Sequence, residues 1–160
     1  MTTRIGFSTP KKFNPVSWLV RKISKSAVSH CFFIYHDKDW DINMVMEAHE
    51  LGFRLIPFAH FEKKNKIIAI IKPKVSLEEG LQHVALEYLG TSYDFIGGFM
   101  LLMWRWFGRK WRNPLVNVHS IVCSEAAVIA MRKGKYPNSE SLVPQDIMPQ
   151  DLLEFFMGKV

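Results

Sequence analysis

The chain has 160 residues, of which 48% are hydrophobic and 13% aromatic. This composition excludes a disordered chain because it supplies the apolar surface of a packed core, and the length fits one domain over residues 1–160. The formal net charge of +6 favours an anionic partner but does not distinguish a nucleic acid, a membrane surface and a cell-wall polymer.

The first seven residues contain one cation and no apolar run, so they lack the pattern of a secretory signal. We therefore expect a cytoplasmic protein. In that compartment Cys31 and Cys123 are expected to be free thiols rather than a disulfide. Each cysteine is then available as a packing residue or as a nucleophile.

The first 72 residues predict a series of strands with one early helix. Apolar, β-branched and aromatic residues gather in segments typical of strands, and polar turns separate these segments. Pro15–Lys25 instead has its apolar residues at helical spacing. Because the strands follow one another closely, we expect an antiparallel meander. The predicted strands are Arg4–Ser8, Val28–Tyr35, Asn43–His49, Gly52–Pro57 and Lys66–Lys72.

Helical patterns dominate the second half of the chain. Ser76–Glu79 has the sequence of a capping box and predicts a helix over residues 76–89. The segments Phe95–Phe107 and Ser120–Met131 are predicted to be helical, and Pro149 opens a terminal amphipathic helix that ends at Phe156. Strands grouped before helices indicate an α+β fold in which an antiparallel meander sheet packs against helices.

The most apolar run, Phe95–Phe107, is 13 residues long and includes a cation. A helix that spans a bilayer needs about 20 apolar residues, so this run is too short to cross one. Its tryptophans and cations suit a membrane surface or the cover of an apolar groove, and a core helix with a basic end is an equal alternative. The residues predicted to contact a membrane or another anion are Trp104, Arg105, Trp106, Arg109, Lys110 and Trp111.

A nucleophile and its base can be chosen from the cysteine and histidine positions. Cys123 falls in the first turn of a predicted helix, where backbone N–H groups and the helix dipole favour a thiolate. Strand alternation places His30 and Cys31 on opposite faces, and Glu47 on the next strand can approach His30. The alternatives are a buried inert Cys123 and ordinary strand positions for His30 and Glu47.

Several short segments occur in the order of one known family. They are SHCFFIY from Ser29, MEA from Met46, YDFIGG from Tyr93, VCSE from Val122, VPQD from Val143 and MPQDL from Met148. Together they resemble the circularly permuted NlpC-type papain-like cysteine hydrolases, the branch that includes the YiiX-like proteins and, more remotely, the lecithin:retinol acyltransferases. In that branch the strands that carry the histidine and its polar partner precede the helix that carries the cysteine.

The resemblance implies a permuted papain-like fold and a role for each matching residue. Cys123 would be the nucleophile, His30 the general base and Glu47 the orienting third residue. His49 is the alternative third residue, because the acyltransferase relatives use a histidine there, and Tyr93 would contact the substrate. The implied reaction is acyl transfer or hydrolysis at an amide or ester bond of a peptide, a peptidoglycan fragment or a lipid, without a metal or cofactor.

Other classes of function fit less of the sequence. Asp37–Asp41 resembles the start of a calcium loop, but Ile42 and Ala48 stand where such a loop needs glycine and a bidentate glutamate. The histidines and cysteines lack the spacing of a zinc site. A nucleic-acid module would use the charge and the Trp-Arg pairs but leaves the three candidate catalytic residues without a role. A non-catalytic structural protein on the same fold, such as a component of a phage particle, stays open.

Overall fold

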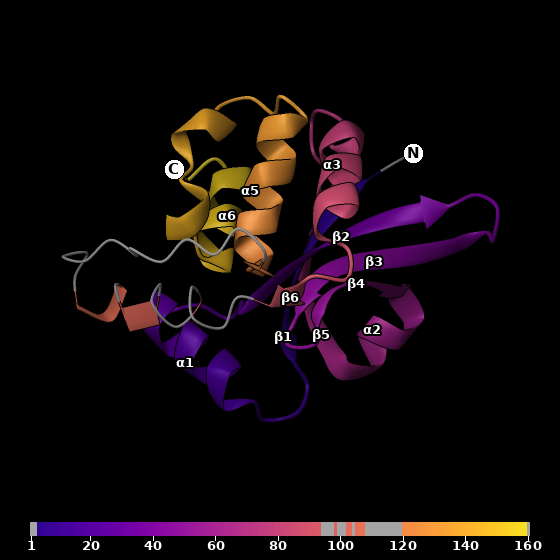
Figure 1. The fold of residues 1–160 in the computed structure, drawn as a ribbon. Helices are drawn as coiled ribbons and strands as arrows, with labels where there is room; N and C mark the ends of the chain where they lie inside the picture. Colours follow the sequence, from indigo (N-terminus) through magenta and orange to yellow (C-terminus); the bar gives the residue numbers. More distant parts are fainter. Residues whose placement is uncertain (1–2, 94–97, 99–101, 104, 108–119, 160) are drawn as a thin grey trace.

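The apolar segments of the first half of the chain form a five-stranded antiparallel sheet with the strand order β4-β3-β2-β1-β5 (Figure 1). The computed structural model describes residues 3–93, 98, 102–103, 105–107 and 120–159. A short parallel pair joins two further strands. The strands are β1 (Arg4–Pro10), β2 (His30–Asp37), β3 (Ile42–His49), β4 (Gly52–Pro57), β5 (Asn65–Ile71), β6 (Ser92–Tyr93) and β7 (Ser120–Ile121).

The order of the strands corrects the predicted meander. β2, β3 and β4 follow one another as expected, but β5 pairs with β1 at the other edge of the sheet, where Ile5 lies opposite Ile71. The sequence prediction missed the helix α2 (Phe58–Lys64), which separates β4 from β5. Because the buried side chain of Phe61 packs against Phe32 of the sheet, α2 carries the chain across the sheet before β5 begins.

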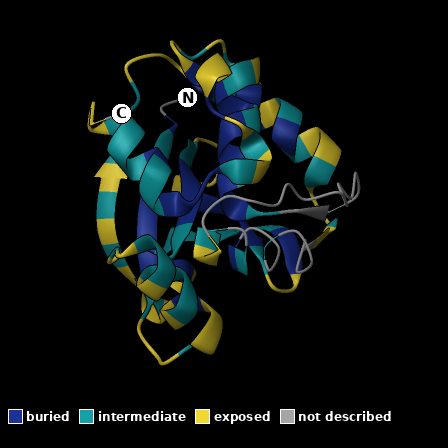
Figure 2. Cartoon of the chain, turned by 90° about the vertical axis from the view of Figure 1, so that its left-hand side faces the viewer, coloured by how far each residue is buried: buried dark blue, intermediate teal, exposed yellow. Residues whose placement is uncertain are grey.

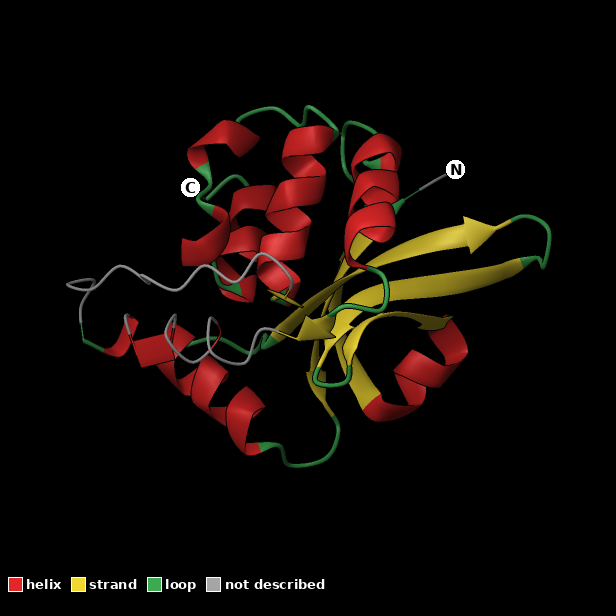
Figure 3. Ribbon diagram, viewed as in Figure 1, coloured by secondary structure: helices red, strands yellow, loops and turns green. Residues whose placement is uncertain are grey.

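Helices form a second layer on one face of the sheet (Figure 3). In Figure 1, α3, α5 and α6 lie together on this face, whereas α2 lies on the other and α1 stands apart beside β1. The α+β fold class is therefore confirmed. The helices not yet given are α1 (Pro15–Ser24), α3 (Glu78–Tyr88), α5 (Cys123–Lys133) and α6 (Pro149–Phe156), and two short 3-10 helices cover Ser139–Ser141 and Pro144–Asp146.

Two predicted helices begin later than the sequence indicated. The expected capping box at residue 76 is wrong, because the hydroxyl of Ser76 accepts a hydrogen bond from the backbone N–H of Glu78 at 3.3 Å, and α3 begins at Glu78 itself. The helix predicted from Ser120 begins at Cys123, because residues 120–121 pair with β6 as a strand. Cys123 is thereby the first residue of α5.

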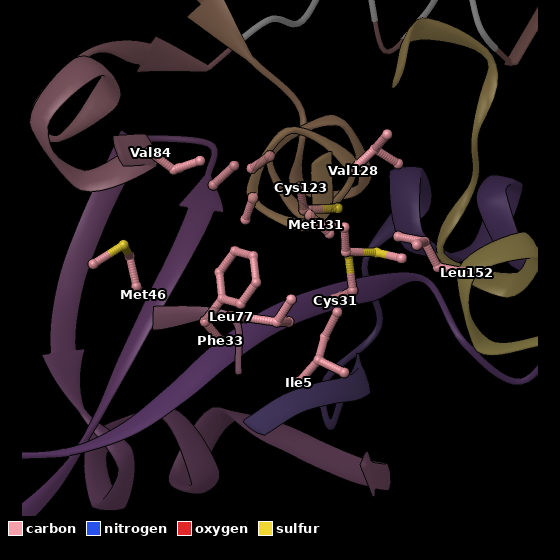
Figure 4. Packing of buried hydrophobic residues seen from close by; sticks show 14 of the residues in the cluster. Ile5, Cys31, Phe33, Met46, Leu77, Val84, Cys123, Val128, Met131 and Leu152 are labelled. Atoms are coloured by element: carbon pink, nitrogen blue, oxygen red, sulfur yellow. The ribbon is translucent and has the colours of Figure 1, made fainter. Parts of the chain in front are cut away.

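The buried side chains fall into two clusters, one on each face of the sheet. Figure 2 marks the buried residues of the strands and helices in dark blue. The larger cluster fills the space between the sheet and the layer of α3, α5 and α6, and Figure 4 shows Cys31, Phe33 and Cys123 within it. The smaller cluster lies beneath α2 and includes Phe32 and Phe61. Alternate residues of β2 therefore face different cores.

Small residues bring α5 close to its neighbours. A Cβ atom added to Gly80 of α3 would lie 1.8 Å from the carbonyl oxygen of Ala130, so the two helices touch through backbone atoms at this point. Ala126 and Ala127 of α5 are fully buried. With short side chains on this face, α5 can approach the sheet closely enough for its first residue to meet strand residues.

Of the predicted helix Phe95–Phe107, residues 102–103 and 105–106 are helical, and most of the rest lies outside the described residues. In the part of the chain that the structure describes, no helix combines the length and hydropathy required to cross a bilayer.

Candidate active site

Three side chains from neighbouring strands are joined by hydrogen bonds across the sheet. Nε2 of His30 on β2 lies 2.7 Å from Oε2 of Glu47 on β3. The other carboxylate oxygen, Oε1, accepts hydrogen bonds from Nε and Nη2 of Arg54 on β4, at 3.0 Å and 2.7 Å. Glu47 and Arg54 are directly opposite each other in the β3–β4 register. The carboxylate is therefore held between a histidine and an arginine.

Glu47 is buried, with an exposed fraction of 3%. Burial alone raises the pKa of a carboxyl group, but here the hydrogen bonds and charges of His30 and Arg54 outweigh it and lower the pKa of Glu47. Glu47 is consequently ionised and can stabilise a positive charge on His30. Since Nε2 of His30 is engaged by Glu47, Nδ1 is the ring nitrogen left for a second partner.

That second partner is Cys123, which interacts with His30 through a hydrogen bond and through charge. His30 is the first residue of β2, so it lies at the end of that strand. Burial opposes the charged imidazole, but the Cys123 charge, the hydrogen bond to it and Glu47 raise the pKa of His30 to about 10. The site therefore favours an imidazolium beside a thiolate.

The start of α5 is fixed by its own backbone and by a neighbouring serine. Val122 is the extended N-cap residue, so the thiol of Cys123 lies where the helix has backbone N–H groups without an intrahelical acceptor. The buried hydroxyl of Ser124 donates to the carbonyl oxygen of Ile147 at 2.6 Å. This bond anchors the first turn of α5 to the segment that leads into α6.

Cys31 is a partner of Cys123 that the sequence prediction missed. A hydrogen bond from Cys31 is the largest influence that lowers the pKa of Cys123 well below its usual range, followed by the charge of His30, while burial opposes both. The pKa of Cys31 itself is raised, first by burial and then by its contact with Cys123. Both cysteines are free, and they lie in the same buried cluster (Figure 4). Cys31 therefore stays a neutral thiol that donates to the Cys123 thiolate.

The predicted substrate contact, Tyr93, lies on β6, whose backbone pairs with Ile121 two residues before Cys123. The side chain of Tyr93 lies outside the described residues. The backbone N–H of Phe53 on β4 donates to the carbonyl oxygen of Thr91 at 2.9 Å, which ties the start of β6 to the main sheet. Gly52 has a φ of +114°, and an added Cβ would lie 2.5 Å from the Thr91 oxygen, so this connection requires glycine.

His49, the alternative third residue, lies two positions beyond Glu47 on β3 and takes a different environment. Its Nδ1 accepts a hydrogen bond from the N–H of Leu51 at 3.3 Å, and its Nε2 lies 3.9 Å from Glu50. Burial and the charge of Arg54 lower the pKa of His49. Of the two predicted third residues, Glu47 forms the hydrogen bond with His30 among the described hydrogen bonds.

The predicted membrane or anion contacts are only partly described. Trp104, Arg109, Lys110 and Trp111 lie outside the described residues. Trp106 is exposed. Arg105 is half-buried and forms an ion pair with Asp151 of α6, whose carboxylate also accepts the backbone N–H of Met148 at 2.9 Å. The MPQDL segment thus holds the start of α6 and binds Arg105.

Arg54 is the other site residue that the sequence prediction missed, although a signal for it exists. The turn between β3 and β4 pairs His49 with Gly52, and the same register places Glu47 opposite Arg54. A buried glutamate opposite an arginine on a neighbouring strand is a favourable cross-strand pair. Cys31 has no comparable local signal, because its partner lies on a distant helix.

Among the described residues, no group of three or more histidine, cysteine, aspartate or glutamate side chains is placed to hold a metal ion. No protein-family model matches the chain, and a search of the curated proteins finds no significant match.

Proposed function

We propose that the protein is a cysteine-dependent hydrolase or acyltransferase of the permuted papain-like type, acting on an amide or ester bond. The observation that carries the proposal is the pairing of His30 with the buried Glu47 at 2.7 Å, next to Cys123 at the start of α5. An ordinary structural histidine does not require an ionised carboxylate on one side and a thiol of lowered pKa on the other.

The proposed reaction begins with attack of the Cys123 thiolate on the substrate carbonyl carbon. The new S–C bond gives a tetrahedral oxyanion, which the backbone N–H of Cys123 at the start of α5 can stabilise. His30 then donates its proton to the leaving oxygen or nitrogen as the carbonyl bond to that atom breaks. For hydrolysis, His30 takes a proton from water, the hydroxide attacks the thioester, and the acid and the thiolate are released.

Each neighbouring residue has a defined part in this proposal. Glu47 orients His30 and stabilises its charged form, and Arg54 keeps Glu47 ionised. Cys31 donates a hydrogen bond to the thiolate before attack. Glu47, Arg54 and Cys31 are positioning residues, whereas Cys123 and His30 meet the reacting atoms.

A second candidate is a non-catalytic protein on the same fold, and the burial of Cys123 favours it. The exposed fraction of Cys123 is 6%, which is typical of an inert packing cysteine and gives a substrate carbonyl little access to the sulfur. This alternative leaves the ion-paired His30 and Glu47 without a function.

The test is the rate of iodoacetamide alkylation at each cysteine as a function of pH, read by mass spectrometry. We expect Cys123 to react below about pH 7 much faster than Cys31, and His30→Ala to remove this advantage. His49→Ala is the matched control and should leave the profile unchanged. Inert cysteines, or a Cys123 that titrates like an ordinary thiol with or without His30, would exclude the catalytic role.

Activity is then measured with a short-chain thioester or a p-nitrophenyl ester. Cys123→Ala should lower turnover at least about a thousandfold, which also excludes a contaminating esterase as the source of activity. If Cys123 is reactive toward iodoacetamide but Cys123→Ala turns over the substrate as fast as the wild type, the reactive thiol does not perform this hydrolysis.

A further inference from the structure

The helix α1 leaves part of its apolar surface exposed. Ser17 is its buried residue, and the Ser17 hydroxyl lies 2.6 Å from that of Ser29 and 3.4 Å from that of Thr9. By contrast, Val16 and Trp18 are exposed, with exposed fractions of 60% and 45%. A surface helix normally buries its apolar stripe and exposes its polar one. In α1 the hydroxyl of Ser17 is buried, Leu19, Val20 and Ile23 are half-buried, and Val16 and Trp18 stay exposed.

The buried hydroxyl of Ser17 has polar neighbours on its own side of the helix. At about 3.6 residues per turn, Ser17, Arg21 and Ser24 fall on one side. The Arg21 guanidinium donates a hydrogen bond to the carbonyl oxygen of Ser17 at 3.4 Å. The Ser24 hydroxyl donates one to the carbonyl oxygen of Val20 at 2.8 Å. Val16 and Trp18 lie about 100° to either side of Ser17. Leu19 and Ile23 lie on the opposite side and are half-buried.

An exposed phenylalanine extends this apolar surface before the helix begins. Phe13 has an exposed fraction of 79%, although it is one of the largest apolar side chains in this part of the chain. Several large apolar side chains exposed within one short segment are typical of an interaction site rather than of scattered surface residues. We refer to Phe13, Val16 and Trp18 as the α1 apolar surface.

The same segment carries the positive charge of the protein. Residues 1–36 contain six lysines and arginines and no aspartate or glutamate, and the rest of the chain holds equal numbers of basic and acidic residues. The net charge of +6 therefore belongs to this segment. Nζ of Lys22 lies 4.8 Å from the centre of the Trp18 ring, so a cation is held directly over the α1 apolar surface. Lys12 and Lys25 flank it and are exposed.

We propose that the α1 apolar surface and its lysines dock the protein on the surface of an anionic lipid bilayer. Aromatic and aliphatic side chains together with lysines suit the boundary between lipid headgroups and acyl chains, where both kinds of residue find a partner. Nucleic acid is the less suitable occupant, because an aliphatic side chain such as Val16 gains little from phosphates or stacked bases.

Docking through α1 places the candidate active site next to the membrane. The Ser17–Ser29 hydrogen bond links α1 to the residue directly before His30. In Figure 1, α1 lies toward the end of α5 at which Cys123 begins the helix. A lipid with an ester or amide bond is therefore the substrate class that this arrangement favours. The substrate class rests on the proposed function, whereas the docking does not.

The test is co-sedimentation with vesicles of phosphatidylcholine alone and of phosphatidylcholine mixed with phosphatidylglycerol. We expect the protein to bind the mixed vesicles and not the neutral ones. Lys12→Gln with Lys22→Gln should weaken binding roughly 25-fold, at about fivefold per cation. The matched control is Lys133→Gln with Lys135→Gln, which removes the same charge at the far end of α5 and should have little effect.

The apolar contribution has its own pair of variants. Phe13→Gln should weaken binding roughly tenfold or more, since it removes a large exposed apolar side chain from the contact. Leu86→Gln on α3, where the exposed fraction is 90%, is the matched control and should bind as the wild type does. Circular dichroism spectra equal to that of the wild type show that all four variants are folded.

Three results would overturn the docking. The first is no binding to the mixed vesicles, and the second is an equal loss of vesicle affinity in the α1 variants and their controls. The third is an oligonucleotide that displaces the protein from the vesicles and binds the wild type and Phe13→Gln with the same affinity. Cys123→Ala should bind vesicles normally. If Cys123 is reactive and the vesicles do not bind, the docking fails while the proposed function stands; if vesicles bind and Cys123 is inert, the reverse holds.

Discussion

The helices α5 and α1 are nearly equal in length, at 11 and 10 residues, but they meet the rest of the protein in opposite ways. Most residues of α5 are buried, whereas Ser17 is the buried residue of α1. α5 is held by small side chains and holds Cys123 in place, while α1 is attached through hydroxyl groups and leaves Val16 and Trp18 exposed. Apolar content thus does not decide which helix belongs to the core; the fit of its faces to the neighbouring elements does.

The largest effect on stability is expected beneath the start of α5, at Glu47. Glu47→Gln leaves the charges of His30 and Arg54 without their carboxylate, and we expect the free energy of unfolding to fall by about 3 kcal/mol. Chemical denaturation measures this loss. Glu50→Gln, which changes an exposed carboxylate on the neighbouring turn, is the control and should be nearly neutral.

The same variant has a defined pH dependence. The lowered pKa of Glu47 adds stability that is complete above about pH 4.5, the ordinary pKa of this group. This stability is lost as the pH falls through the pKa that Glu47 has in the folded protein. The raised pKa of His30 adds stability that is complete below about pH 6.5, the ordinary pKa of histidine. This stability is lost as the pH rises toward about 10, the pKa of His30 in the folded protein. The free energy of unfolding of the wild type should therefore exceed that of Glu47→Gln most between about pH 4.5 and about pH 6.5. A difference that grows with alkaline pH would contradict the ion pair.

The contact between α3 and α5 should be the next most sensitive. Gly80→Ala places a methyl group against the Ala130 carbonyl oxygen, and the helices must separate to accept it. Overpacking of this kind outweighs the gain in helix propensity, so we expect a net loss of about 2 kcal/mol. Thermal and chemical unfolding report it. The exposed neighbour Glu79→Ala should stay within about 0.5 kcal/mol, and a neutral Gly80→Ala would mean that α3 and α5 do not pack this closely.

A smaller change in stability, with a clear chemical signature, is expected at Cys31. Cys31→Ala removes a buried sulfur and should cost about 1 kcal/mol. It also removes the hydrogen bond that lowers the pKa of Cys123, so the alkylation profile of Cys123 should move to higher pH. Cys31→Ser keeps a donor and should move the profile less. Identical profiles in all three proteins would show that Cys31 does not bind the thiolate.

The smallest effect on stability is expected on α1. Val16→Ser replaces an exposed side chain and should change the free energy of unfolding by less than about 0.5 kcal/mol. The same substitution at the fully buried Val128 of α5 should cost several times more. Parallel denaturation curves of the two variants give the comparison directly. Equal losses would mean that α1 is packed as tightly as α5.

Features set by neighbouring residues could be predicted from the sequence. The β2–β3 hairpin and the helical position of Cys123 follow from short-range patterns, and the structure has both. The approach of Glu47 to His30 was predicted from the same hairpin, since alternation puts both residues on one face.

Features set by distant residues could not be predicted in this way. β5 resembles the other strands in composition, so nothing local indicates that it pairs with β1 rather than β4. The role of Cys31 depends on the approach of α5, which in turn depends on Gly80 and Ala130. The attachment of α1 depends on Ser17, whose partners are Thr9 of β1 and Ser29, the residue directly before β2.

The two halves of the candidate site are made at different times during translation. His30, Glu47 and Arg54 lie on consecutive strands near the start of the chain, so their ion pairs can form soon after these strands leave the ribosome. Cys123 is synthesised much later and reaches them only once α5 has packed against the sheet. A growing chain therefore carries His30 and Glu47 before Cys123 exists, and the three residues meet only in a molecule whose core is already assembled.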